Sequence, residues 1–301
     1  MIKKSSARMF FGTALIALVA LTGVAATIVV GTILMRADAA ERVPLSDVSH
    51  IHGIAVDPRD SERLVLATHH GIFLAGGDGI AERISGERND YMGFTPHPGD
   101  PGILYASGHP TSGGNMGFIA SRDGGATWRP ISEGVEGPVD FHAMDVSAAD
   151  PQVIYGVYGA IQVSRDAGKS WQIAGTPPAD VFDLAASALD SDLVYAATRN
   201  GLMVSRDGAK SWESTGPAGQ PATMVQVGSD GAVYAFVLGN GLLRAPGAAL
   251  NWQQVTADLG ERVLLHLAID RTNPRRMFAV TDEGRILTST NGGRNWAAVS
   301  P

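Results

Sequence analysis

Ser121-Arg-Asp-Gly-Gly-Ala-Thr-Trp128 is one copy of an eight-residue repeat that decides the fold of this chain. Three further copies are Ser164-Arg-Asp-Ala-Gly-Lys-Ser-Trp171, Ser205-Arg-Asp-Gly-Ala-Lys-Ser-Trp212 and Ser289-Thr-Asn-Gly-Gly-Arg-Asn-Trp296, and a degenerate copy ends at Trp252. Successive tryptophans lie 43, 41, 40 and 44 residues apart. This spacing is typical of the four-stranded blades of a β-propeller. The repeat therefore predicts an all-β propeller.

A second pattern fills the space between these copies and gives the number of blades. It consists of two short apolar strands separated by a polar turn, such as Asp100-Pro101 or Asp150-Pro151, and Asp before Pro favours a turn. The pattern occurs six times, although the first unit has Gly76-Gly77-Asp78-Gly79 and no tryptophan. Each unit would supply strands A to D from the axis outward, and closure of the ring removes exposed sheet edges. We expect a six-bladed propeller over residues 49–301.

The eight-residue repeat resembles the Asp-box, or BNR-like repeat, found in bacterial sialidases, sortilin-type receptors and a photosystem assembly factor. The resemblance covers nearly all of residues 49–301, and it extends to bacterial exported propellers that are labelled glycosyl hydrolases. Within the copies, Asp123, Asp166 and Asp207 can accept hydrogen bonds from turn amides, while the glycines supply positive φ angles. We therefore expect these hairpins to join strands C and D at the outer rim and to stabilise the blades.

The N-terminal segment predicts a membrane anchor. Residues 1–8 contain Lys3, Lys4 and Arg8, and an uncharged, mostly apolar run of 27 residues follows at 9–35. Such a run can span a bilayer, and its basic flank should stay in the cytoplasm. The sequence thus predicts a single-pass protein whose propeller lies outside the cytoplasm after a linker at 36–48. Cleavage near Ala37-Asp38-Ala39-Ala40 would release the propeller and is the alternative.

Charge and cysteine content exclude several classes of partner and site. The chain has a formal net charge of −7, of which residues 1–40 contribute +3, so the rest carries −10. An acidic surface of this kind argues against nucleic acid as a partner. The chain contains no cysteine, which excludes disulfides, thiolate metal sites and a lipid-bearing cysteine.

The histidines are concentrated in the first three units. Seven of the eight lie between residues 50 and 142. In the repeat alignment His52, Met92 and His142 share one strand A position, which later units fill with Phe182, Thr223 and Leu265. His70 and His109 share a position at the end of strand B. Because strand A begins and strand B ends on the same face of a propeller, these side chains should converge at the funnel mouth.

A convergent set of imidazole and thioether groups predicts a transition-metal site. Without thiols this ligand set suits copper, and imidazole also serves zinc, which is the alternative. The candidate ligands are His52, Met92, His142, His70, His109, His50, His69 and Met144. Asp90 or Asp140 could orient the imidazoles or adjust the site toward Cu(II) or Zn²⁺. His97 and His266 are expected to lie apart from this cluster.

The sequence favours a binding module over an enzyme. A glycosidase needs two carboxylates that flank the scissile bond, and the sequence singles out no such pair. The carboxylates expected near the funnel face are Asp90, Asp140, Asp180, Asp183, Asp282 and Glu283. The expected partner is a metal ion or an envelope protein. A sialidase-like glycoside hydrolase acting on extracellular glycans and a non-catalytic assembly scaffold are the two alternatives.

Overall fold

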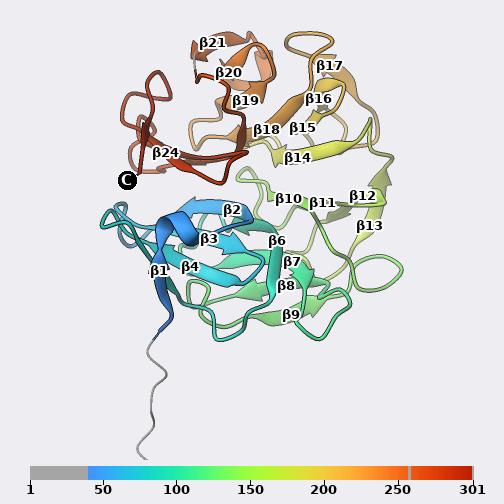
Figure 1. The fold of residues 1–301 in the computed structure, drawn as a ribbon. Coiled ribbons are helices and arrows are strands. Elements are labelled where there is room, and N and C mark those ends of the chain that lie inside the picture. The colour runs from blue at the N-terminus through green and yellow to red at the C-terminus, as the bar shows by residue number, and fades with distance from the viewer. Residues whose placement is uncertain (1–39, 257–258, 300–301) are drawn as a thin grey trace, which may run out of the picture. The chain divides into compact units, whose positions relative to one another are not determined.

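The computed structural model describes residues 40–256 and 259–299 and confirms an all-β, six-bladed propeller. Figure 1 shows the sheets in a ring that follows chain order, with the first blade beside the last. Each of the six sheets is antiparallel and is built around four consecutive strands.

The blades are bounded as follows. The first contains β2 (Ile51–Val56), β3 (Leu64–Thr68), β4 (Gly71–Ala75) and β5 (Ile80–Arg83). The second contains β6 (Asp90–Pro96), β7 (Leu104–His109), β8 (Phe118–Ser121) and β9 (Arg129–Ser132). The third contains β10 (Ala143–Val146), β11 (Ile154–Tyr158), β12 (Ala160–Ser164) and β13 (Gln172–Gly175).

The remaining three blades follow the same order. The fourth contains β14 (Val181–Ala186), β15 (Val194–Thr198), β16 (Gly201–Ser205) and β17 (Glu213–Thr215). The fifth contains β18 (Ala222–Val227), β19 (Val233–Val237), β20 (Gly241–Ala245) and β21 (Gln253–Thr256). The sixth contains β22 (Leu264–Ile269), β23 (Met277–Thr281), β24 (Ile286–Ser289) and β25 (Ala297–Ala298).

Part of the segment expected as a linker belongs to the first blade. Strand β1 (Arg42–Pro44) pairs antiparallel with β5, with Val43 opposite Ala81, and makes this sheet five-stranded. A short 3-10 helix, Leu45–Asp47, follows it. In the part of the chain that the structure describes, no helix is long and apolar enough to cross a membrane. The predicted anchor at 9–35 lies outside the described residues.

The eight-residue repeats form braced hairpins between the outer strands, as expected. In the third blade the Ser164 hydroxyl donates to Asp166 and accepts the amide of Gly168, both at 2.8 Å. Asp166 in turn accepts the amide of Ser170 at 2.9 Å. The Ser170 hydroxyl also donates to Asp166, at 2.6 Å, and this bond contributes most to lowering the pKa of Asp166 to about 2. Ala167 and Gly168 have φ angles of 61° and 80°, which the tight turn requires.

The same repeats pack neighbouring blades together. The Trp171 ring lies 5.3 Å from the ring of Phe118 and 4.8 Å from that of Phe141, and its indole N–H donates to Ser132. Phe118 is fully buried and fits because residue 168 is glycine: a Cβ there would lie 2.0 Å from the Phe118 ring. The repeat therefore fixes one blade against the preceding one through a glycine and a tryptophan.

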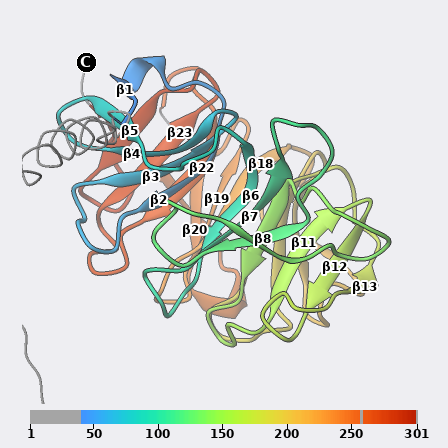
Figure 2. The same ribbon diagram turned by 90° about the horizontal axis from the view of Figure 1, so that it is seen from below.

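The ring closes by packing between the first and sixth blades. Ile54 and Leu66 share a hydrophobic core cluster with Phe278 and Val280, and Figure 2 shows β22 and β23 beside the strands of the first blade. The Arg276 guanidinium also donates to Ser61 and Glu62 across this junction. Each blade uses consecutive strands, so side-chain packing rather than an exchanged strand holds the ring shut.

Two carboxylates connect the innermost strands of neighbouring blades. Asp145 on β10 accepts the Thr95 hydroxyl and the Ala186 amide, both at 2.9 Å, from the blades on either side. Asp183 on β14 accepts the Val225 amide of the fifth blade at 2.9 Å. Burial raises the pKa of Asp145 to about 6 and that of Asp183 to about 7, against the opposing effect of these hydrogen bonds.

These raised pKa values predict that part of the stability is lost as the pH rises. A buried carboxyl whose pKa is higher in the folded than in the unfolded chain stabilises the fold while protonated, and this contribution falls through the folded pKa. We expect the free energy of unfolding of wild type, minus that of Asp183→Asn, to fall between about pH 4 and pH 7 by up to about 1.4 kcal/mol per pH unit, and to level off above the folded pKa. Urea titrations at four pH values with a chelator present measure this difference. Asp180→Asn, at an exposed carboxylate, is the control, and a difference that does not vary with pH would contradict the prediction.

Candidate metal centre

The register of the paired strands shows which residues of different blades are equivalent. It corrects the predicted match of His70 with His109. Thr68 lies opposite Ile51 in the first blade as Thr198 lies opposite Val181 in the fourth. His69, the residue after Thr68, is therefore the equivalent of Arg199, and the same register in the second blade makes it the equivalent of His109.

The pairing of His70 with His109 is therefore wrong by one residue. Val65 lies opposite Ala55 as Tyr195 lies opposite Ala185, so the first blade has valine at the position where other blades have an aromatic residue. Alignment on Leu66 shifted the register, and such a shift moves side chains to the other face. His70 is exposed, and its ring centroid is 6.3 Å from that of His69.

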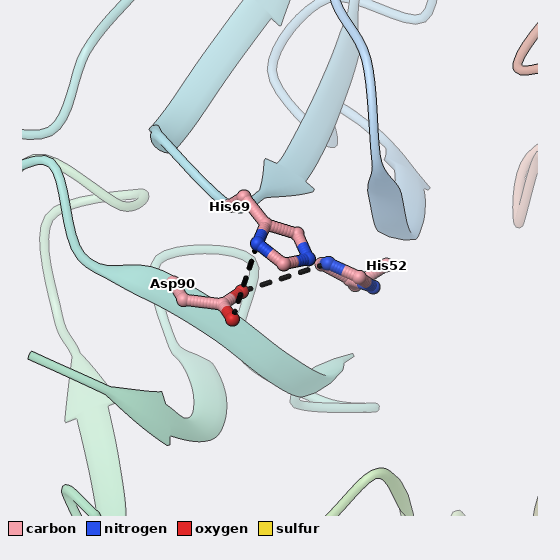
Figure 3. Close-up of side chains that lie close together, drawn as sticks. All are labelled: His52, His69 and Asp90. Carbon is pink, nitrogen blue, oxygen red and sulfur yellow. Dashed lines mark ion pairs between the residues drawn. The ribbon is translucent and has the colours of Figure 1, made fainter. Parts of the chain in front are cut away.

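The first cluster consists of His52, His69 and Asp90, which come from two neighbouring blades. The two oxygens of Asp90, at the start of β6, face the two imidazoles: Oδ1 is 3.6 Å from His52 Nε2 and Oδ2 is 3.6 Å from His69 Nδ1 (Figure 3). All three ligand atoms lie within 4.8 Å of one another. Ligands bonded at about 2.1 Å to a tetrahedral ion lie about 3.4 Å apart, so the two separations of 3.6 Å from Asp90 to the imidazoles fit a metal ion.

Two atoms of the first cluster are buried without a hydrogen-bond partner: His52 Nε2 and Asp90 Oδ1. Buried polar atoms in native proteins are nearly always paired, so an unpartnered pair that faces each other requires an explanation. Burial lowers the pKa of His52 to about 4, although the Asp90 carboxylate opposes this shift. A cation between these two atoms would satisfy both of them. The His50 ring lies edge-on to His69, with centroids 4.9 Å apart.

The second cluster consists of His109, Asp140 and His142. Oδ2 of Asp140 lies 3.0 Å from His109 Nε2 and 2.7 Å from His142 Nε2. Asp140 is buried, and its other oxygen, Oδ1, has no hydrogen-bond partner. The hydrogen bond to Asp140 raises the pKa of His142.

The predicted convergence of His52, Met92 and His142 does not occur: His52 belongs to the first cluster, His142 belongs to the second, and Met92 belongs to neither. Met92 is buried, and Met144 packs in a core cluster with Tyr105 and Phe118. The reason is geometric. One strand A position recurs at intervals around the axis, whereas the end of strand B in one blade adjoins the start of strand A in the next.

From the sequence, Asp90 and Asp140 are expected only to support the site, and His266 is expected to lie apart from it. Both aspartates lie two residues before the shared strand A position, a spacing that would have identified them as equivalents. His266 lies nearer the first cluster than expected: its ring bonds the backbone of Ile51, and burial lowers its pKa to about 4. His97 lies in a turn between strands, as expected, where its Nδ1 accepts the Asp100 amide at 2.8 Å.

The other carboxylates considered for glycoside hydrolysis are engaged in local contacts. Asp180 pairs with Arg199 at 2.8 Å, and Glu283 pairs with Arg285 at 3.1 Å. Asp183 accepts backbone amides, as described above, and Asp282 accepts the Val263 amide at 3.1 Å. These contacts give the four carboxylates structural partners and single out no catalytic pair.

Comparisons with known proteins support the fold. No protein-family model matches the sequence, and no curated protein matches it. Among solved structures, the GH74 enzyme of Niastella koreensis has a TM-score of 0.59 and 15% identity, over 83% of this chain and 45% of that one. The GH74 xyloglucanase of Xanthomonas campestris has a TM-score of 0.56 and 17% identity, over 86% and 47%. YCF48 bound to D1 peptide has a TM-score of 0.53 and 17% identity, over 86% and 84%.

These likenesses place the chain in the class of β-propellers and show the fold alone. The chain spans about half the length of the GH74 proteins that it resembles. The class includes enzymes and a peptide-bound protein, so the function must be argued from the side chains of this chain.

Proposed function

We propose that this chain is a propeller that binds a divalent transition-metal ion at its funnel face, with His52, His69 and Asp90 as ligands. The observation that carries the proposal is the facing pair of buried, unpartnered atoms, His52 Nε2 and Asp90 Oδ1, at 3.6 Å. A cation lodged between the imidazoles and the carboxylate removes the cost of leaving these atoms without partners.

The donor atoms favour Cu(II) or Zn²⁺ over Cu(I). Two imidazole nitrogens and a carboxylate oxygen are suitable ligands for either divalent ion, whereas Cu(I) prefers sulfur. The buried position of Met144 in the core supports this choice. Three protein ligands leave one coordination position of a four-coordinate ion for water or a partner's side chain.

The cellular setting that we propose is the outer side of a membrane. The basic tail and apolar run at 1–35 support a single-pass anchor, and the acidic remainder of the chain is suited to attracting cations. There the propeller would act as a binding module for metal, or for an envelope protein at the same face. Metal storage, delivery or tolerance are the roles consistent with such a module.

Metal binding by the full chain tests the proposal. We expect the purified protein to bind Zn²⁺ or Cu²⁺ after removal of adventitious metal, and its thermal midpoint to rise with metal concentration, because an ion that binds only the folded state stabilises it. Equilibrium dialysis with elemental analysis measures the binding. A wild-type chain that takes up neither ion would overturn the proposal.

Glycan cleavage and a protein scaffold are tested with the same preparation. Both are suggested by the fold likeness to GH74 enzymes and to peptide-bound YCF48. Turnover of aryl glycosides that was lost on Asp90→Asn or Asp140→Asn would favour an enzyme. Recovery of one envelope protein equally by wild type and by a His52→Ala chain, without metal, would favour a scaffold.

A further inference from the structure

The second cluster repeats part of the first one blade further around the ring. His69 and His109 are equivalent residues at the end of strand B, and Asp90 and Asp140 are equivalent residues at the beginning of the innermost segment of the following blade. A histidine of one blade thus faces an aspartate of the next blade twice. The third member differs: His52 belongs to the blade of His69, whereas His142 belongs to the blade of Asp140.

Hydrogen bonding fixes the tautomer of His109 and directs a ligand atom at Asp140. His109 Nδ1 lies 2.9 Å from the carbonyl oxygen of Gly114, which can only accept, so Nδ1 carries a hydrogen. In the neutral ring Nε2 is then an acceptor, and it faces Asp140 Oδ2 at 3.0 Å. Two acceptors at this distance repel each other unless a cation lies between them. The same arrangement, with a carbonyl orienting the ring, is usual for metal-bound histidine.

The loop that orients His109 is anchored to the third blade. The Asn115 side-chain amide donates to the Pro138 carbonyl at 3.0 Å and to the Tyr158 hydroxyl at 3.1 Å. Asp140 Oδ1 is buried without a partner, so a lone proton at Nε2 would leave this second acceptor unsatisfied. A divalent ion can serve His109, His142 and both oxygens of Asp140.

The two clusters differ most in the exposure of their third member, because the other two members are no more exposed in the second cluster than in the first. The His142 side chain is 66% exposed, compared with 21% for His52 in the first cluster. Only the aspartate, at 5%, is deeply buried. An ion here would keep coordination positions on the water side, where a donor or acceptor molecule can reach it.

We propose that His109, Asp140 and His142 form a second divalent-metal site, which exchanges its ion faster than the first. This goes beyond the proposed function, because the two sites share no ligand. An experiment can therefore contradict the second site and still support the first. The chain would then hold two ions on neighbouring blades, one retained and one exchangeable.

Calorimetric titration of the full chain with Zn²⁺ at pH 7.5 tests this inference. We expect two equivalents in wild type, and one equivalent each in His142→Ala and His69→Ala. Release of Zn²⁺ to a coloured chelator should be slower from His142→Ala, which keeps the first site, than from His69→Ala, which keeps the second. Phe182→Ala is the matched control, since Phe182 holds the strand A position of His142 in the fourth blade and is 48% exposed. It should keep both equivalents.

Three outcomes would overturn the inference. A single equivalent that His69→Ala abolishes would remove the second site and leave the proposed function standing. Two equivalents that survive in His142→Ala would place the second ion elsewhere. Absence of binding in wild type would remove both proposals. Circular dichroism and unfolding of each variant show whether a lost equivalent reflects a lost ligand or a lost fold.

Discussion

Asp90→Asn is expected to bind divalent metal at the first cluster at least about 100-fold more weakly than wild type, because replacement even of groups that only orient the ligands costs 10–100-fold. Asp90 supplies an oxygen toward each imidazole and the only negative charge of the cluster. The amide keeps the shape but removes the charge and one acceptor. Calorimetry on the full chain, with His142→Ala as background so that one site is titrated, measures the change.

Asp180→Asn is the matched control for this prediction. Asp180 lies at the equivalent position of the fourth blade but forms an ion pair with Arg199 at 2.8 Å. We expect its affinity for metal to equal that of the background chain. Equal affinity in Asp90→Asn and Asp180→Asn chains would show that Asp90 is not a ligand and would place the ion elsewhere.

Phe118→Ala is expected to lower the free energy of unfolding by about 3–5 kcal/mol, the usual cost of removing a buried phenylalanine. Phe118 is fully buried between the second and third blades, with its ring 5.1 Å from that of Tyr105 and 5.3 Å from that of Trp171. Because the backbone of Gly168 approaches the ring closely, the cavity cannot be filled by a small side-chain movement. Urea denaturation followed by tryptophan fluorescence measures the loss.

Ile173→Ala provides the control, since Ile173 lies on β13 of the third blade and is 52% exposed. We expect it to change stability by no more than about 0.5 kcal/mol. The Phe118→Ala chain should still bind metal under native conditions, because the ring and core partners of Phe118 include no ligand of either cluster. A loss below about 1 kcal/mol would mean that the interface between these blades relaxes, in contrast to the usual behaviour of close-packed cores.

The blade count followed from local chemistry and could be read from the repeat. The hairpin of residues 164–171 is held by hydrogen bonds among its own serine, aspartate and glycine, so its signature is recognisable in the four full copies. Blade-to-blade packing through Trp171 follows from the same eight residues. The first blade lacks the tryptophan and has Val65 where the other blades have an aromatic residue, so alignment by sequence places His70, rather than His69, level with His109.

The sequence by itself determined the all-β repeat architecture, the six blades and the concentration of histidines in the first three of them. Only the tertiary structure decided which of these histidines meet, and that each pair meets an aspartate. The repeat shows which residues occupy the same position in different blades. A site depends instead on which side chains of neighbouring blades approach one another. The end of strand B in one blade adjoins the start of strand A in the next, so His69 meets Asp90 and His109 meets Asp140. Met144 also could not be assigned from the sequence, because only the packing of the blades places it in a hydrophobic core cluster.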